Sequence, residues 1–126
     1  MVRAIRGAIT VETNSEQEIL DSTFELLKTM TQQNGIEKDD IISIIFSVTM
    51  DLNAAFPAVA ARRLGWVETA LMSTYEIDVP GSLRKCIRVL MHINTEKNIS
   101  ELKFIYLKEA KQLRPDLLEQ NQKTGG

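Results

Sequence analysis

Arg88 lies in the middle of an apolar segment, C-I-R-V-L-M-H-I at residues 86–93, whose pattern is typical of a β-strand. A buried guanidinium group is costly unless an anion or a polar group pairs with it. Arg6 shares one face of another predicted strand with the small residues Ala4 and Ala8, which favours an open cavity beside a long cation. Because guanidinium groups bind carboxylates through paired hydrogen bonds, these arginines indicate a pocket for a small polyanionic metabolite, with a dicarboxylate favoured.

Each candidate residue also has a purely structural explanation. Arg88 could pair with an internal Asp or Glu, or it could face water on an edge strand. Arg6 could lie on an exposed strand surface, and Glu76, in T-Y-E-I-D, could be a loop carboxylate without a role. Tyr106 alternates with Phe104 in F-I-Y-L, a pattern more typical of a core. Solvated surface positions would explain the other arginines considered, which are Arg62, Arg63 and Arg114.

Composition limits the chemistry that the chain can perform. Its 126 residues are 44% hydrophobic with a net charge of -2, which predicts one globular domain and no nucleic-acid or anionic-membrane partner. One cysteine, Cys86, and one histidine, His92, exclude an internal disulfide and a histidine-rich metal site, and we expect both to be packing residues. A Gly-rich phosphate loop and the H-E-x-x-H and C-x-x-C spacings are absent. Because no apolar run approaches about 18 residues and the N-terminus lacks an apolar signal region, we expect a cytoplasmic protein.

Strand and helix patterns alternate along the chain. Residues 3–12 predict a strand, and an amphipathic helix should begin at Asn14 or Ser15 and end at Gly35. Pro57 is expected to begin a short helix that Gly65 ends. The predicted apolar face of the long helix comprises Ile19, Leu20, Thr23, Phe24, Leu26, Leu27 and Met30. The other predicted elements are a strand at 40–50, one or two strands within 66–79, a turn at 80–81, strands at 86–94 and 103–107, and an ambiguous segment to residue 113.

The order β-α-β-α-β-β-β predicts an α/β (α+β) fold in which a mixed sheet has one long covering helix. Residues 40–50, D-I-I-S-I-I-F-S-V-T-M, are apolar on both faces, which predicts a central strand that is covered on both sides. One long helix cannot cover both faces of the sheet. We therefore expect another copy of the chain to bury the uncovered face.

Four segments, in one order, resemble the small monofunctional chorismate mutases of the trimeric α/β-barrel class, which is distinct from the all-helical class. They are I-R-G-A-I-T-V-E at 5–12, S-V-T-M-D-L-N-A-A-F-P-A at 47–58, E-I-D-V-P-G-S-L-R-K-C-I-R-V-L-M at 76–91 and Y-L-K-E-A-K-Q-L-R-P-D-L at 106–117. The resemblance covers about residues 2–117. We therefore predict one chorismate mutase-like domain at 1–117 and a polar C-terminal tail at 118–126.

This resemblance implies a homotrimer that forms a pseudo-barrel ringed by helices, with active sites between neighbouring subunits. The implied reaction is the Claisen rearrangement of chorismate to prephenate, in phenylalanine and tyrosine biosynthesis, without a cofactor or metal. One C–O bond breaks as one C–C bond forms, with no obligatory proton transfer, so a shortage of nucleophiles is no obstacle. The enzyme must hold a compact, chair-like substrate and stabilise negative charge that grows on the ether oxygen.

The resemblance also implies residue roles where the motifs match. Arg88 would be the cation at the ether oxygen, Arg6 would bind a substrate carboxylate, and Tyr106 would donate a hydrogen bond to a carboxylate. Glu76 would accept a hydrogen bond from the ring hydroxyl. The residues implied to line the pocket are Phe56, Ala58, Leu71, Met72 and Ser73. Those implied to close its mouth from the partner subunit are Arg62, Leu113 and Arg114, with the C-terminal segment as a lid.

The chain departs from the family pattern at several positions. Ser73 stands where a cysteine that contacts the substrate hydroxyl is usual, and a serine hydroxyl can donate the same hydrogen bond. Val59 replaces a common lysine at the pocket rim, which weakens attraction for the dianion, and Met72 replaces a usual threonine. Ser82 replaces the second glycine of a G-G pair, and one residue is missing before the glycine that ends the short helix. Simple alternation also puts Ser73 and Glu76 on opposite faces of one strand.

Two alternative functions follow from the same residues. One is a trimeric protein that binds small carboxylates between subunits, such as an imine-hydrolysing deaminase of similar architecture. Chorismate chemistry needs Arg88, Glu76 and Tyr106 together, whereas a general carboxylate-binding protein needs only the arginine. The other alternative is a structural interaction module, in which Arg88 would be paired internally.

Overall fold

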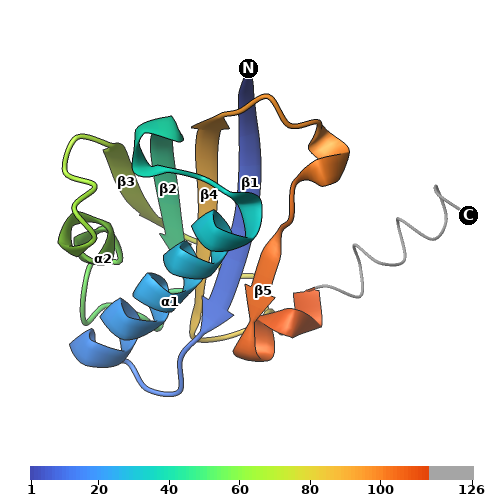
Figure 1. Ribbon diagram of the computed structural model, residues 1–126. Coiled ribbons are helices and arrows are strands. Elements are labelled where there is room, and N and C mark those ends of the chain that lie inside the picture. Colours follow the sequence, from blue (N-terminus) through green and yellow to red (C-terminus); the bar gives the residue numbers. More distant parts are fainter. Residues whose placement is uncertain (114–126) are drawn as a thin grey trace, which may run out of the picture.

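The computed structural model describes residues 1–113, and the structural statements below concern that part of the chain. Its strands are β1 (Val2–Thr10), β2 (Ile41–Val48), β3 (Ala70–Tyr75), β4 (Cys86–Asn94) and β5 (Ile105–Leu107). They form one sheet in the order β3-β2-β4-β1-β5 (Figure 1). β4 is antiparallel to β1 and β2, whereas β3 is parallel to β2 and β5 is parallel to β1. The predicted mixed α+β fold is confirmed.

Local signals set the helix limits as expected. α1 (Glu16–Asn34) begins after Ser15, whose hydroxyl accepts a hydrogen bond from the backbone N–H of Glu18, and it ends at Gly35, with φ +62°. α2 (Ala58–Arg63) follows Pro57. Three short 3-10 helices span Lys38–Asp40, Ile99–Glu101 and Lys108–Leu113, and the last of these is the segment that the pattern left ambiguous. No helix among residues 1–113 is long and apolar enough to cross a membrane.

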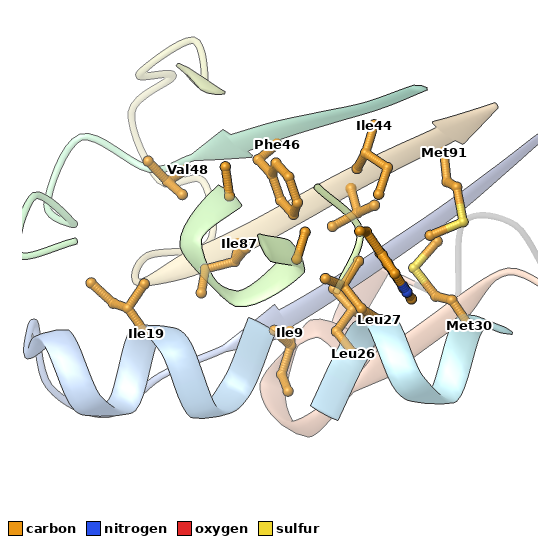
Figure 2. Close-up of a cluster of buried hydrophobic side chains, with 14 of the residues drawn as sticks. Ile9, Ile19, Leu26, Leu27, Met30, Ile44, Phe46, Val48, Ile87 and Met91 are labelled. Carbon is orange, nitrogen blue, oxygen red and sulfur yellow. The ribbon is translucent and has the colours of Figure 1, made fainter. Parts of the chain in front are cut away.

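The core lies between α1 and the sheet. Figure 2 shows side chains of β1, β2 and β4 meeting one face of α1, and those labelled include Ile9, Phe46, Ile87, Leu26 and Met30, all fully buried. The prediction for Phe24 is wrong, because 37% of this residue is exposed and the Lys28 ammonium lies 5.4 Å from its ring centroid. The apolar face of α1 is thus narrower than predicted, since Phe24 lies at its margin and packs against a lysine instead of the sheet.

A glycine allows α1 to approach the sheet closely. A Cβ atom on Gly7 of β1 would lie only 2.5 Å from Met30 Sδ and 3.1 Å from Leu26 Cδ1. Real side chains do not tolerate the first of these distances, so a larger residue at this position would force Met30 to move. The glycine therefore sets the distance between the helix and the strand that carries Arg6.

The opposite face of the sheet has no α-helix over it in the described chain, because α1 and α2 lie on the same side (Figure 1). The 3-10 helix Lys108–Leu113 packs on part of this face, where Ala110 clusters with Ala8 and Tyr106. On β2, Ser43, Ile45 and Ser47 are half-buried, and 44% of Ile42 is exposed. The described chain therefore covers one face of this strand, because its α-helices form one layer on a sheet with two faces. The expected burial of the other face by another copy stays a prediction.

Candidate active site

Strand register brings one residue from each strand into a single row across the sheet. Thr74 is opposite Ser47, Ser47 and Ala8 flank Arg88, and Ala8 is opposite Tyr106. Directly opposed residues in a sheet project to the same face. Because the residues that alternate with them face α1, this Arg88 row lies on the face that no α-helix of residues 1–113 covers.

Arg88 and Glu76 come together on that face. Arg88 Nε lies 3.6 Å from Glu76 Oε1, and the two side chains are 29% and 28% exposed. Glu76 follows β3 and donates its backbone N–H to Val48 O at 2.8 Å, so the ladder continues far enough to present the carboxylate to Arg88. Among the described residues, the buried Nε atom of Arg88 has no hydrogen-bond acceptor. The guanidinium is therefore held in place, yet it keeps donor capacity for an added anion.

Tyr106 belongs to a small buried cluster beside Arg88. Its other buried members are Ala8, Cys86 and Ala110, and Leu113 packs against them. Burial raises the pKa of the Cys86 thiol to about 11, while the nearby Arg88 acts in the opposite direction. The thiol is thus protonated near neutral pH and contributes packing, as expected, and not a nucleophile.

Arg6 lies on the same face as Arg88 but is more open to solvent. Arg6 is opposite Leu90 in the β1–β4 ladder and lies two residues before Ala8, which belongs to the Arg88 row. The register therefore places two guanidinium groups diagonally on adjacent strands. His92, on the same face, has its Nδ1 atom 3.2 Å from the Ser43 hydroxyl oxygen, as a packing residue with one polar partner.

Two of the implied site residues, Phe56 and Ser73, lie elsewhere. They line a cavity of about 430 Å³ together with Val59, Arg63 and residues of α1 and the core. Ser73 alternates with Thr74 and Glu76, so its side chain projects to the helix side of β3, as simple alternation predicts. One copy of the chain therefore does not bring Ser73 to Arg88. We refer to this hollow as the Phe56 cavity.

The remaining implied residues are spread over both groups. Met72 is 63% exposed and, through the register of β3 with β2, shares the open face with Arg6. Ala58 is buried in the core, and Leu71 packs against it. Arg62 is exposed on α2, and its neighbour Arg63 lines the cavity instead. Arg114 lies outside the described residues.

Some residues of these two groups were not singled out from the sequence. Ser47 and Thr74 belong to the Arg88 row, but only strand register reveals this, and register is not encoded in a local pattern. Arg63 was noted only as a surface residue. The helical spacing of four between Val59 and Arg63 was the available signal that both face the same way.

Together, these features define an α+β domain with a cationic sheet face suited to a small anion. The chorismate mutase type I family model matches residues 2–117. Chorismate mutase AroH of Thermus thermophilus is 48% identical over 118 residues, which cover 93% of this chain and 97% of that protein. The AroH protein of Bacillus subtilis is 42% identical over 118 residues, covering 93% of each chain. A solved chorismate mutase structure from Clostridium thermocellum shares 61% identity with a TM-score of 0.87, covering 87% of this chain and 98% of that one.

The chain therefore belongs to the chorismate mutase type I family. It is an isomerase that converts chorismate to prephenate, a step of aromatic amino acid biosynthesis. This activity is favoured over the carboxylate-binding and deaminase alternatives. The structural-module alternative required an internally paired Arg88, and Arg88 does pair with Glu76 at 3.6 Å, so the family match and not this geometry decides against that alternative.

Proposed function

We propose that each active site forms between two copies of the chain in a homotrimer. The Arg88 row and Glu76 of one copy would face the Phe56 cavity of its neighbour. Two observations support this arrangement: the implied residues separate onto opposite sides of β3, and within residues 1–113 the sheet face around Arg88 has no α-helix over it. A single copy would then hold two halves of different sites.

In this site Arg88 stabilises the charge that develops on the ether oxygen as the C–O bond stretches. The supporting observation is its buried Nε atom, which lacks a hydrogen-bond acceptor among residues 1–113 and lies beside Glu76. A fixed cation interacts more strongly with the transition state than with the neutral ether of the substrate. Exclusion of water by the neighbouring copy would strengthen this interaction, and such a group contributes about 3–4 kcal/mol.

The other polar residues hold the substrate in its reactive shape. Arg6 binds one carboxylate, and the Tyr106 hydroxyl donates to a carboxylate of the substrate. Glu76 accepts a hydrogen bond from the ring hydroxyl and offsets positive character on the ring. The cavity half supplies shape, because bringing the two reacting carbons together requires a compact, chair-like conformer. The residues proposed to surround the substrate are Phe56, Ala58, Arg62, Leu71, Met72, Ser73, Leu113 and Arg114.

Subunit complementation tests the shared site. Arg88→Ala disables the sheet half, and Phe56→Asp places a carboxylate in the cavity half, where it repels the dianion. Each variant alone should be nearly inactive. Co-expressed in equal amounts, they should regain about a quarter of wild-type activity, because random cyclic trimers then contain that share of intact sites.

A matched pair serves as the control for this experiment. Arg88→Ala and Arg6→Ala both damage the sheet half. In their mixture every site therefore carries one of the two substitutions, and no site is intact. We expect no recovery above the sum of the two variants. Failure of the first mixture to recover, with mixed trimers verified by two affinity tags, would refute the shared site. A fully active monomer in light scattering would refute it as well.

Location and domain limits can be tested separately from the site. We propose a cytoplasmic location, and fractionation of the source cells would test it. We also propose that the catalytic domain ends at residue 117, and truncation after that residue should leave the turnover of chorismate intact.

A further inference from the structure

Lys85, the residue before β4, has a backbone conformation that residues with side chains rarely adopt. Its φ is +50°, in the left-handed region, where Cβ crowds the neighbouring carbonyl. Such a conformation persists only where surrounding contacts hold it. The contacts that hold Lys85 therefore determine how β4, and with it Arg88, enters the sheet.

Asp51, in the loop after β2, provides one set of those contacts, and the backbone N–H of Val11, which donates to Lys85 O at 2.9 Å, provides another. The Oδ2 and Oδ1 atoms of Asp51 accept the backbone N–H of Lys85 at 3.0 and 3.3 Å. The Thr49 hydroxyl donates to Asp51 Oδ1 at 2.5 Å and accepts the backbone N–H of Cys86 at 3.0 Å. The backbone N–H of Thr49 donates in turn to Cys86 O at 3.1 Å. Carboxylate and hydroxyl together tie the end of β2 to the first residues of β4.

The hydrogen bonds of Asp51 and Thr49 reach Cys86, which lies two residues before Arg88 on β4. Cys86 and Arg88 project to the same face of β4, so the backbone at Cys86 sets the direction in which the guanidinium points. We propose that Asp51 is a positioning residue, whose carboxylate holds Lys85 and Cys86 so that Arg88 keeps its place beside Glu76. The proposal rests on the catalytic role given to Arg88 above.

Asp51 acts through the backbone and not on the substrate. Its carboxylate oxygens already accept the Lys85 N–H and the Thr49 hydroxyl. A carboxylate in direct contact with a dicarboxylate would repel it. The expected signature is therefore a loss of turnover with little loss of binding.

The first measurement compares Asp51→Ala with the wild type. Turnover follows from the decrease in chorismate absorbance, and urea unfolding of the same samples gives the free energy of unfolding. We expect kcat to fall about tenfold or more while KM changes by less than about threefold, because a displaced catalytic group mainly impairs transition-state stabilisation. The assay temperature is one at which circular dichroism shows the variant folded.

A rescue experiment separates positioning from stability. Glycine adopts a positive φ without strain, so adding Lys85→Gly to Asp51→Ala should raise kcat about threefold or more. Lys85→Ala is the matched control, because it also removes the ammonium that donates to Glu12 O but keeps the Cβ atom. It should restore no activity. Asp51→Asn, whose amide oxygen still accepts a hydrogen bond, should have an intermediate kcat.

Several outcomes would overturn the proposal. One is wild-type kcat in Asp51→Ala, and another is equal rescue by Lys85→Ala and Lys85→Gly. If Asp51→Ala does not fold, an unchanged kcat in Asp51→Asn decides against it. Arg88→Ala, assayed alongside, separates this proposal from the proposed function: full activity of Arg88→Ala refutes the role of Arg88, whereas an inactive Arg88→Ala with a fully active Asp51→Ala refutes the positioning alone.

Discussion

Arg88 Nε and Glu76 Oε1 are 3.6 Å apart, close enough for an ion pair and too far for a good hydrogen bond. The two groups come from β4 and from the residue after β3, which are not neighbours in the sheet. A tighter contact would direct the guanidinium N–H groups to the carboxylate. The observed separation orients the cation and leaves donors for a substrate.

Replacement of Arg88 should abolish most of the catalysis. We expect Arg88→Ala to lose more than about 2 kcal/mol of transition-state stabilisation, measured as kcat/KM for chorismate. Arg88→Lys should also be impaired, because a compact ammonium does not reproduce the guanidinium fork. Arg84→Ala is the control, since Arg84 is exposed and pairs with Asp78 at 2.9 Å. Near-normal turnover in Arg88→Ala would show that the assigned role is wrong.

The Cys86 thiol should make stability depend on alkaline pH. Burial raises its pKa from 9.0 to about 11 in the folded chain. The protonated thiol therefore favours folding fully below pH 9, and this contribution is lost as the pH rises through about 11. Urea unfolding from pH 8 to 11 should show the wild type losing its advantage over Cys86→Ala across that window. Parallel pH curves for the two proteins would contradict the prediction.

Gly7→Ala should destabilise the fold through overpacking. The added methyl group would meet Met30 Sδ at 2.5 Å, and we expect a loss of about 1–3 kcal/mol in the free energy of unfolding. Met30→Ala should cost about 2–5 kcal/mol by leaving a cavity. In the double variant the methyl group would occupy part of that cavity, so the combined loss should be smaller than the sum. Strict additivity in urea unfolding would exclude the close contact as the cause.

Asn34→Ala should weaken the connection between α1 and the segment before β5. The buried Asn34 amide donates to Lys103 O at 2.9 Å and accepts the Lys103 backbone N–H at 2.7 Å. Its removal leaves both backbone groups without their partner, at a cost of about 1–3 kcal/mol in unfolding free energy. Gln33→Ala, at the exposed neighbouring position, should have little effect. Equal stability of the two variants would count against this account.

The features of the fold that could be predicted are those with local signals. Ser15 and Gly35 bound α1 because a hydroxyl cap and a left-handed glycine act within one helical turn. β4 matches its predicted limits because apolar, β-branched residues continue without a break until a polar loop. Phe24 was misplaced because a helical wheel does not distinguish the margin of an apolar face from its centre.

The candidate site was less predictable, because its parts are distant along the chain. Arg88 was conspicuous, since a cation in an apolar strand demands an explanation. Asp51 was not, because an acid after a strand resembles any turn residue, and the Lys85 N–H that it accepts lies 34 residues away. The division between the Arg88 row and the Phe56 cavity emerges only from strand order and register, which no local pattern specifies.

The Arg88 row gives this enzyme an unusual link between assembly of its sheet and its chemistry. Every strand contributes one member, from Ala8 on β1 to Tyr106 on β5. Detachment of either edge strand would remove one neighbour from the row while leaving most of the core intact. Catalytic turnover is therefore expected to vanish before helical circular dichroism does, and to serve as an early sensor of partial unfolding.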